Sequence, residues 1–417
     1  MPNLSGKYNR DTVQVEEALN RIQAHVRVLE TETVPLAQAS GRRVAARIAA
    51  PHPYPAFRRS GMDGYAVRAA DLAAASRDTP VVLEVVEHIP CGCVPERPVA
   101  SGQTSRIMTG AMLPEGADTV VMFEMTETIE RDGAACISVM KPLVSGTNVS
   151  GIGSEVGEAE LLLEEGRVIG AGETALLAVF GITEVPVYRR PTIAILSTGS
   201  ELLPADAPLE PGKIRNSNAW MLAERVRALG GIPLVLETAA DELEHVRAAI
   251  LEALAQADAV ITSGGVSVGD YDVLADWLVS WEGTTLFTKV AMRPGSPTSA
   301  GVLYGKLIFA LSGNPGACFV GFELFVRPAL AAMQGTAGPA LQRIRALLGE
   351  GFPKVNNYPR YVRGTLSFAE GRVYAVTHRH NQSGSLISIK DTTALIVIPA
   401  GGSGLQPGDL VDVLLLG

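Results

Sequence analysis

Cysteine and histidine are scarce in this sequence of 417 residues. The four cysteines, Cys91, Cys93, Cys136 and Cys318, have no C-x-x-C spacing, and the six histidines lie too far away to complete a zinc knuckle. The two thiols of "CGC" leave a soft-metal site open, but buried or incidental thiols are the favoured interpretation.

Long uncharged apolar runs and concentrated basic charge are also missing. No segment approaches about 18 uncharged apolar residues, and the start, "MPNLSGKYNRDTVQ", lacks the apolar stretch of a secretory signal. The formal net charge of −9 is spread along the chain, and no basic stripe favours nucleic acid. We therefore expect a soluble, cytoplasmic protein with no nucleic-acid or membrane partner.

Glycine, proline and apolar residues are plentiful. The 43 glycines and 26 prolines predict many tight turns, and a hydrophobic content of 47% is ample for packed cores. A chain of this length is expected to form about two to four domains.

Strand and helix patterns alternate in the most regular part of the sequence. Expected strands lie at 192–198, 232–237, 257–263, 285–291 and 307–311, and expected helices at 217–231, 241–257, 271–281 and 315–333. Such alternation predicts right-handed crossovers and a doubly wound, mostly parallel α/β domain.

The flanking parts have other patterns. An amphipathic helix is expected over 11–29, with Asp11 and Gln14 spaced as a capping box, and a second helix over 172–180. Short strands between about 45 and 145 predict a β-rich module, and the turns after 340 predict a small C-terminal β-barrel.

Polar residues follow the strands of the α/β region. Ligands bind beyond the carboxyl ends of such strands, so Glu201, Asp241 and Asp270, from three separate loops, are expected on one rim. Convergent carboxylates without His or Cys suit Mg²⁺ or a similar hard cation. Loop amides and the pair Lys289 and Arg293 would bind the remaining anionic oxygens. The loop residues expected to contact a ligand are Ser263, Gly264, Gly265, Ser267, Gly269, Ser312, Gly313, Asn314 and Pro315.

Each acidic residue also has a structural alternative. Asp241, with Glu244, has the spacing of a helix N-cap, Asp270 could cap the following helix, and Glu201 could open a helix. The spacing of "GGVSVG" excludes both the dinucleotide fingerprint and the Walker loop. In "FRRSGMDGYAV", spacing alone favours an Asp63-Gly64 hairpin turn, and Thr109 in "RIMTGA" could simply end a strand.

These motifs resemble the molybdopterin molybdotransferase family, which comprises the bacterial MoeA proteins and the C-terminal domain of gephyrin. The resemblance is carried, in the family order, by "SGMDGYAV", "RIMTGA", "LSTGSEL", "RNSNAWML", "TSGGVSVGDYD", "RPGSP", "SGNPGACF" and "QSGSLIS…ALIVIP". It spans nearly the whole chain.

The resemblance implies four domains. They are an elongated linking domain (1–45 and 146–186), an inserted β-rich domain carrying "MDGYA" (46–145), an α/β domain of the molybdopterin-binding type (187–335) and a C-terminal β-barrel (336–417). It also implies a homodimer, with the cleft between the α/β domain of one subunit and the inserted domain of the other.

The implied reaction inserts molybdate into adenylated molybdopterin and releases AMP. By motif position, Glu201, Asp241 and Asp270 would hold Mg²⁺, and Lys289 and Arg293 would neutralise phosphate or molybdate charge. The resemblance further places Asp63 and Thr109 in the cleft, has Ser383 contribute from the barrel, and implies a MogA-like adenylating protein as partner.

The sequence departs from the family pattern in three places. "NVSGIGSE" (148–155) stands where the family has an arginine-rich segment, so Ser150 and Gly151 replace guanidinium groups. "RPGSP" keeps Arg293 but has Ser296 where a second lysine is common, and Asn216 replaces an aspartate.

Two classes of function therefore remain open. The first is a metal-dependent transferase, using molybdate or tungstate. The second is a non-catalytic or weakened paralogue that binds molybdopterin as a scaffold. The retained acidic trio favours the enzyme, because a pure binder of a polyanion gains nothing from unpaired acids.

Overall fold

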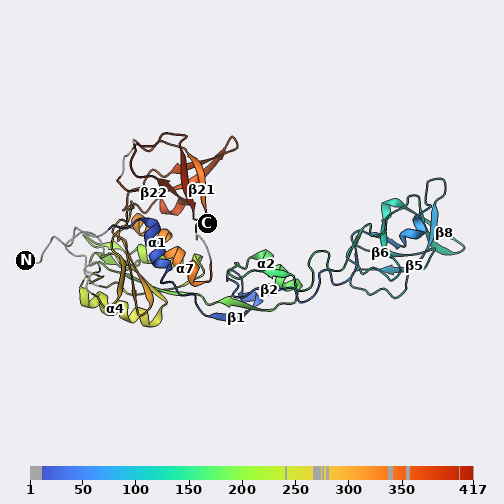
Figure 1. The fold of residues 1–417 in the computed structure, drawn as a ribbon, viewed down its shortest axis with the longest axis horizontal. Coiled ribbons are helices and arrows are strands. Elements are labelled where there is room, and N and C mark those ends of the chain that lie inside the picture. The colour runs from blue at the N-terminus through green and yellow to red at the C-terminus, as the bar shows by residue number, and fades with distance from the viewer. Residues whose placement is uncertain are drawn as a thin grey trace, which may run out of the picture. The chain divides into compact units, whose positions relative to one another are not determined.

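The computed structural model describes residues 12–239, 242–265, 274, 277–278, 281–336, 341–353, 357–402 and 404–416. The chain divides into two compact units, shown as ribbons in Figure 1. Unit 1 comprises Met1–Ala46, Glu165–Thr174 and Thr183–Gly417, and unit 2 comprises Arg47–Glu164 and Ala175–Ile182.

Unit 1 is built around a six-stranded sheet. Its strands, in spatial order, are β16 (Ile232–Val235), β13 (Thr192–Ser197), β17 (Ala259–Ser263), β20 (Lys306–Leu311), β19 (Ser299–Leu303) and β18 (Thr284–Phe287). The first four strands are parallel, and β19 and β18 add an antiparallel edge. The predicted doubly wound, mostly parallel sheet is confirmed.

Both faces of this sheet are buried by helices. Along β13, Ile193 and Ile195 join one apolar cluster, whereas Ala194 and Leu196 join another, because successive strand side chains point to opposite faces. The first cluster includes residues of α1 (Val15–Gln23), α3 (Asn218–Ala228), α6 (Pro315–Gly321) and α7 (Arg327–Met333). The second includes residues of α4 (Leu243–Gln256), which lies on the other side of the sheet from α1 and α7 (Figure 1).

Helix α1 is shorter than the pattern over 11–29 predicts. It starts at Val15 after Gln14, whose side chain makes no capping hydrogen bond, and the chain beyond Gln23 leaves the helix. The capping partner Asp11 lies outside the described residues. The second predicted helix is α2 (Ala171–Val179), and most of the helix predicted over 271–281 also lies outside the described residues.

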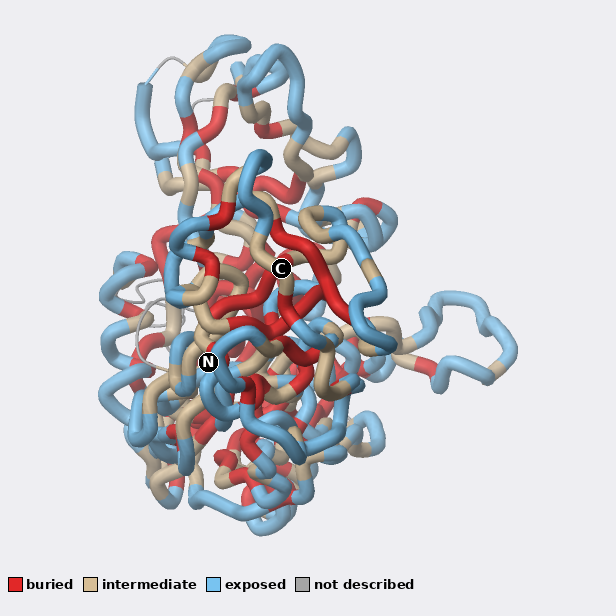
Figure 2. Tube along the Cα trace, turned by 90° about the vertical axis from the view of Figure 1, so that its right-hand side faces the viewer, coloured by how far each residue is buried: buried red, intermediate tan, exposed pale blue. Residues whose placement is uncertain are grey.

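A helical stretch over Pro315–Met333 is interrupted by a π-helical turn, Phe322–Val326. Among the described helices, this 19-residue stretch has the length and apolar composition to cross a membrane. However, 83% of its most apolar window is buried, and α6, α7 and the π-turn all contribute to the first apolar cluster. A buried core helix passes the same test. Figure 2 marks the buried positions along the chain in red.

The C-terminal part of unit 1 is the predicted β-barrel. Five strands close it in the order β21 (Arg343–Leu348), β23 (Arg372–Thr377), β22 (Arg360–Ala369), β24 (Ala394–Ile398) and β25 (Leu410–Leu415). Unit 1 also contains the antiparallel ribbon of β1 (Thr31–Pro35) with β12 (Glu184–Tyr188) and the short pair β14 (Leu202–Leu203) with β15 (Ile214–Arg215).

Unit 2 is the predicted β-rich part. Its sheet has the order β7 (Thr119–Met122), β4 (Gly64–Val67), β6 (Gln103–Ile107), β5 (Val81–Ile89), β9 (Ala134–Val139) and β8 (Thr126–Arg131). Two short antiparallel pairs accompany it, β3 (Arg59–Ser60) with β10 (Val149–Ser150) and β2 (Ile48–Ala49) with β11 (Leu161–Leu163). The four-domain boundaries expected from the resemblance stay a prediction.

Candidate active site

Three parallel strands of the unit 1 sheet end in register. Ser197 of β13 lies opposite Ser263 of β17, and Ser263 lies opposite Leu311 of β20. The ladder continues for one residue, since Thr198 N donates to Ser263 O at 3.0 Å and Gly264 N donates to Leu311 O at 3.1 Å. The loops that follow therefore leave the sheet along a single edge.

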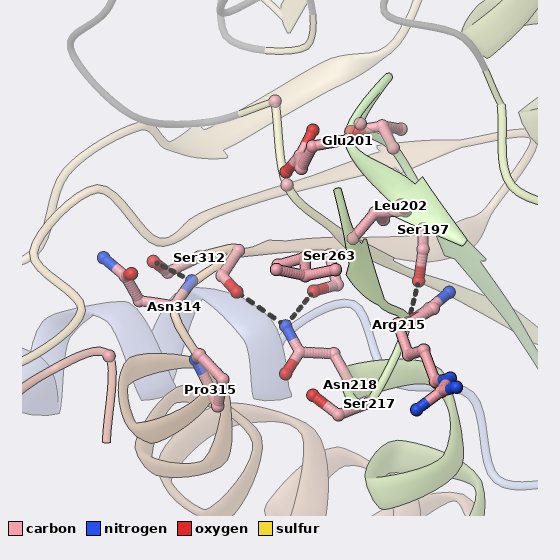
Figure 3. Close-up of a pocket in the computed structure, with 18 residues that line it drawn as sticks. Ser197, Glu201, Leu202, Arg215, Ser217, Asn218, Ser263, Ser312, Asn314 and Pro315 are labelled. Carbon is pink, nitrogen blue, oxygen red and sulfur yellow. Dashed lines mark hydrogen bonds between the residues drawn. The ribbon is translucent and has the colours of Figure 1, made fainter. Parts of the chain in front are cut away.

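A cavity of about 500 Å³ lies at this edge, and we call it the strand-end cavity (Figure 3). Its lining includes Glu201, Ser263, Gly264, Gly265, Ser312, Gly313, Asn314 and Pro315, together with Thr198, Arg215, Asn216 and Asn218. Eight of the predicted site residues thus line one cavity.

Gly264 is the residue that brings the loop after β17 against the loop after β13. Its φ is +104°, and a Cβ added there would lie 2.4 Å from the carbonyl oxygen of Thr198. Only glycine combines this backbone conformation with so close an approach.

Asn218, the first residue of α3, ties the loops together. Its Nδ2 donates to Ser263 Oγ and to the backbone oxygen of Gly313, both at 2.8 Å (Figure 3). Asn216 supports the helix start, because its Oδ1 accepts from Ala219 N at 3.1 Å. Asn218 was not among the predicted site residues, although its place at the start of a helix within "RNSNAWML" was a usable signal.

Two buried oxygen atoms of the strand-end cavity lack a partner among the described residues. They are Thr198 Oγ1 and Asn218 Oδ1. A buried polar atom without a hydrogen bond is costly, so such atoms indicate a place where a ligand supplies the missing partner. With the Glu201 carboxylate, the cavity offers an oxygen-rich donor set, which is what Mg²⁺ prefers.

The predicted metal ligands can be followed only in part. Glu201 lies in a turn before β14, so the alternative that it opens a helix is wrong. Its carboxylate lies close to Gly199, where an added Cβ would be 2.6 Å from Glu201 Oε2. Four of the predicted site residues lie outside the described residues: Asp241, Asp270, Ser267 and Gly269. The described residues alone contain no group of three or more His, Cys, Asp or Glu side chains suited to a metal. The N-cap of α4 is Glu242, without a side-chain capping bond.

A second cavity, of about 610 Å³, adjoins the first, and Ser312 and Asn314 line both. Lys289, Arg293 and Arg360 line it and no acidic side chain does so in the described part of the chain, so we call it the basic cavity. Ser383, from the barrel, is also in its lining, and Ser383 O accepts from Ala317 N of α6 at 3.2 Å. Lys289, Arg293 and Ser383, predicted as site residues, therefore lie around one cavity.

Arg360, which lines the basic cavity, was not predicted as a site residue, and neither was the nearby Arg363, which is not among the lining residues of either cavity. Burial first, and then repulsion from Arg293, lower the pKa of Arg360 below its ordinary value. Arg363 is only 2% exposed, and its Nη2 donates to the backbone oxygens of His380 and Gln382 at 3.3 and 3.1 Å. Its Nε and Nη1 have no partner among the described residues, and burial lowers its pKa.

Asp63 and Thr109 lie together in unit 2. Thr109 donates its backbone N–H and its Oγ1–H to Asp63 Oδ1, both at 2.7 Å. The backbone bond, and then the side-chain bond, hold the pKa of Asp63 below its ordinary value.

The hairpin alternative for Asp63-Gly64 is wrong, because β3 and β4 pair with different strands. Glycine is needed at position 64 for a different reason. A Cβ at Gly64 would lie 2.0 Å from the backbone oxygen of Val121, so β4 and β7 approach too closely for any side chain.

The segment that departs from the family pattern pairs with an arginine. Ser150 lies directly opposite Arg59 in the β3–β10 pair, so the two side chains are on the same face. Arg59 Nη2 bonds Glu155 Oε1 at 2.7 Å, and its guanidinium lies over the ring of Tyr54. A guanidinium missing at position 150 is thus present on the facing strand.

Comparison with known proteins assigns the chain to a family. Residues 13–181 match the MoeA N-terminal region (domain I and II), 194–332 a probable molybdopterin binding domain, and 345–416 the MoeA C-terminal region (domain IV). A protein of Bacillus subtilis (strain 168) named molybdopterin molybdenumtransferase is 44% identical over 407 residues, which is 98% of this chain and 95% of that protein. This chain belongs to the MoeA family.

Other similar proteins support the same family assignment. The protein of the same name from Staphylococcus aureus (strain COL) is 38% identical over 97% of this chain and 96% of its own length. The crystal structure of a molybdopterin biosynthesis MoeA protein from Pyrococcus horikoshii OT3 has a TM-score of 0.83, with 30% identity, over 97% of this chain and all of that chain. The MoeA resemblance of the motifs and the predicted fold class are confirmed.

Proposed function

We propose that the chain transfers molybdate to adenylated molybdopterin, with Mg²⁺-dependent release of AMP. Membership of the MoeA family makes it a transferase of molybdenum cofactor biosynthesis, which fits molybdate and molybdopterin as substrates. The single observation that carries the finer proposal is the pair of adjoining cavities with different chemistry, one rich in oxygen atoms and the other basic.

The strand-end cavity suits the phosphorylated substrate. Its small residues Gly264 and Gly265 let backbone amides approach phosphate oxygens, and Ser263, Ser312 and Asn314 offer further hydrogen bonds. Gly313 and Pro315 also line this cavity, and together with Ser267 and Gly269, which follow β17 in the sequence and lie outside the described residues, they complete the proposed binding set.

Glu201, Asp241 and Asp270 would hold Mg²⁺ in this proposal. The ion would supply charge neutralisation at the phosphoanhydride. Thr198 and Asn218, which carry the two unpartnered oxygens, line the same cavity and would orient the bound phosphate and its waters.

The basic cavity suits the oxyanion. Lys289, Arg293 and Arg360 present three positive charges without a neighbouring acid in the described lining, and the planar guanidinium groups match two oxygens of a tetrahedral anion. Ser383 adds a hydroxyl from the barrel. The shared residues Ser312 and Asn314 would bring the anion beside the substrate that accepts it.

The assembly is part of the proposal. We infer a cytoplasmic homodimer in which Asp63 and Thr109 of one copy complete the cleft of the other, and a MogA-like protein that delivers the adenylated substrate. Sedimentation of the purified chain tests the dimer. Mixing a cleft variant in unit 1 with an Asp63→Ala chain should restore part of the activity only if the site is shared.

The main test is a turnover assay with adenylated molybdopterin, molybdate and Mg²⁺, run beside tungstate and a metal-free control. We expect AMP release that needs Mg²⁺ and falls by at least about a hundredfold in Asp241→Ala or Asp270→Ala. Substrate binding without AMP release would instead indicate a molybdopterin-binding scaffold, and a preference for tungstate would identify a different oxyanion.

A further inference from the structure

Two exposed thiols flank a tight turn in unit 2. Cys93 N donates to Pro90 O at 3.3 Å, and Gly92 has φ +84°, so residues 90–93 form a β-turn with glycine at its third position. Cys91 and Cys93 are both exposed, whereas Cys136 and Cys318 are buried.

The turn brings the two cysteines within reach of one another. Cα atoms two residues apart are at most about 7.6 Å apart, twice the 3.8 Å spacing of neighbours, and a bend shortens that distance. Disulfides span Cα distances of about 4.4–6.8 Å. The glycine between the two thiols adds no side chain to obstruct closure.

Cys91 also contacts the segment that carries Thr109. Its Sγ–H donates to the backbone oxygen of Thr109 at 2.8 Å, and a Cβ on Gly110 would lie 3.7 Å from the sulfur. Thr109 in turn donates two hydrogen bonds to Asp63. The reduced thiol is therefore one of the groups that fix Thr109.

We propose that Cys91 and Cys93 form a reversible dithiol–disulfide site whose oxidant is a small-molecule disulfide, and that only the reduced form holds Thr109 in place. Two S–H bonds and the S–S bond of the oxidant break, one protein S–S bond forms, and the two hydrogens leave on two small thiols. Intracellular disulfides of this kind are transient and regulatory. The effect on turnover rests on the proposed transferase function, whereas the thiol chemistry does not.

The first experiment tests the chemistry. The full-length protein is equilibrated with oxidised glutathione, alkylated under native conditions and measured as an intact chain and as peptides. We expect the loss of two alkylatable thiols and of two hydrogen atoms per chain, an internal link between Cys91 and Cys93, and no change at Cys136 or Cys318. Two thiols that remain alkylatable, or a link between chains, would overturn the proposal.

Single variants make this result specific. In Cys91→Ser and Cys93→Ser, the remaining exposed cysteine should gain glutathione as a mixed disulfide, and dithiothreitol should remove it. An internal link that still forms in either variant would show that another cysteine is the true partner.

The second experiment tests the contact with Thr109 through AMP release. Oxidation should lower kcat of the wild type about fivefold, the factor expected for one lost hydrogen bond, with little change in KM, and dithiothreitol should restore it. The Cys91→Ser/Cys93→Ser double variant keeps a hydroxyl donor and should stay active under the same oxidant. Because the dithiolene of the substrate is itself oxidisable, this variant reports any loss caused by the substrate alone.

The outcomes separate the two proposals. Equal losses in the wild type and the double variant would overturn the regulatory contact while leaving the transferase intact. A reduced wild type without AMP release would contradict the transferase proposal, and the glutathione experiment would still decide whether the thiols pair.

Discussion

At the residue scale, Asp63 shows how local donors fix a charge on an exposed side chain. Both donors come from Thr109 and stabilise the ionised carboxylate, which is why the pKa is lowered. Because the pKa of Asp63 is lower in the folded protein, the stabilisation from this contact is fully present above the ordinary carboxyl pKa of about 3.9. It is lost as the pH falls through the lowered pKa of the folded protein. The Asp63–Thr109 contact therefore persists throughout the neutral range.

This contact gives a prediction for pH titration. The Asp63 carboxyl, followed by carbon-detected NMR, should titrate below pH 3.9, and Thr109→Val should raise its midpoint toward the ordinary value by removing the Oγ1 donor. Asp132, an exposed acid of the same unit, serves as control. Equal midpoints in the wild type and Thr109→Val would contradict the assigned hydrogen bond.

At the element scale, the loop after β17 depends on a backbone conformation. Gly264→Ala should lower the free energy of unfolding by at least about 2 kcal/mol, because φ is +104° and the new Cβ would meet Thr198. Gly172→Ala in α2, where the Cβ meets nothing within 4 Å, should instead stabilise the protein by about 0.5–1 kcal/mol. Urea unfolding of both variants checks the prediction, which a neutral Gly264→Ala would refute.

The short pair β3–β10 gives a second prediction at this scale. Arg59→Ser removes the guanidinium that faces Ser150, so KM for the anionic substrate should rise about fivefold to tenfold. Adding Ser150→Arg should recover most of that loss, because opposite residues of an antiparallel pair project from the same face.

Arg131→Ser removes an exposed arginine from the same unit and is the matched control. Its KM should equal that of the wild type. Failure of Ser150→Arg to rescue Arg59→Ser, measured in AMP-release kinetics, would show that the position of the guanidinium matters as well as its face.

Elements with a local pattern were predictable from the sequence, and contacts between distant segments were not. The alternation of apolar strands such as 192–198 with helices such as 217–231, and the turn-rich segments after 340, depend on neighbouring residues, so they indicated the α/β sheet and the barrel. Gly64 looked like a hairpin glycine because its close approach to Val121 exists only in the folded sheet.

The candidate site likewise contains residues that could be predicted from the sequence and residues that could not. Loop residues directly after strands, such as Glu201 and Asn314, could be found from the order of strands and helices. Arg360 and Arg363 could not, because their position beside the α/β domain depends on how the barrel packs. Glu201 was expected to share a rim with Asp241 and Asp270, and that arrangement stays a prediction.

At the scale of the whole molecule, a buried ion network joins the core helices to the residue that directly follows β25. Glu323, fully buried in the π-turn, accepts bonds from Arg225 Nε and Arg327 Nε, both at 2.6 Å, and Arg327 also donates to the backbone oxygen of Leu416. Removing one member of such a network leaves buried charge without a partner.

Glu323→Ala should therefore reduce the free energy of unfolding by about 3–5 kcal/mol. Glu224→Ala, which breaks an exposed pair with Arg227 on α3, should change it by less than about 0.5 kcal/mol. Urea titrations followed by circular dichroism compare the two. Similar small effects in both variants would mean that the network contributes little.

Ser312 and Asn314 line both cavities of unit 1. A ligand that shifts these residues from one side changes the surface that a ligand on the other side encounters. Thermodynamic reciprocity then requires that each occupant alters the affinity of the other by the same factor. Such heterotropic cooperativity would let the arrival of one reactant report on the presence of the second before any bond is broken.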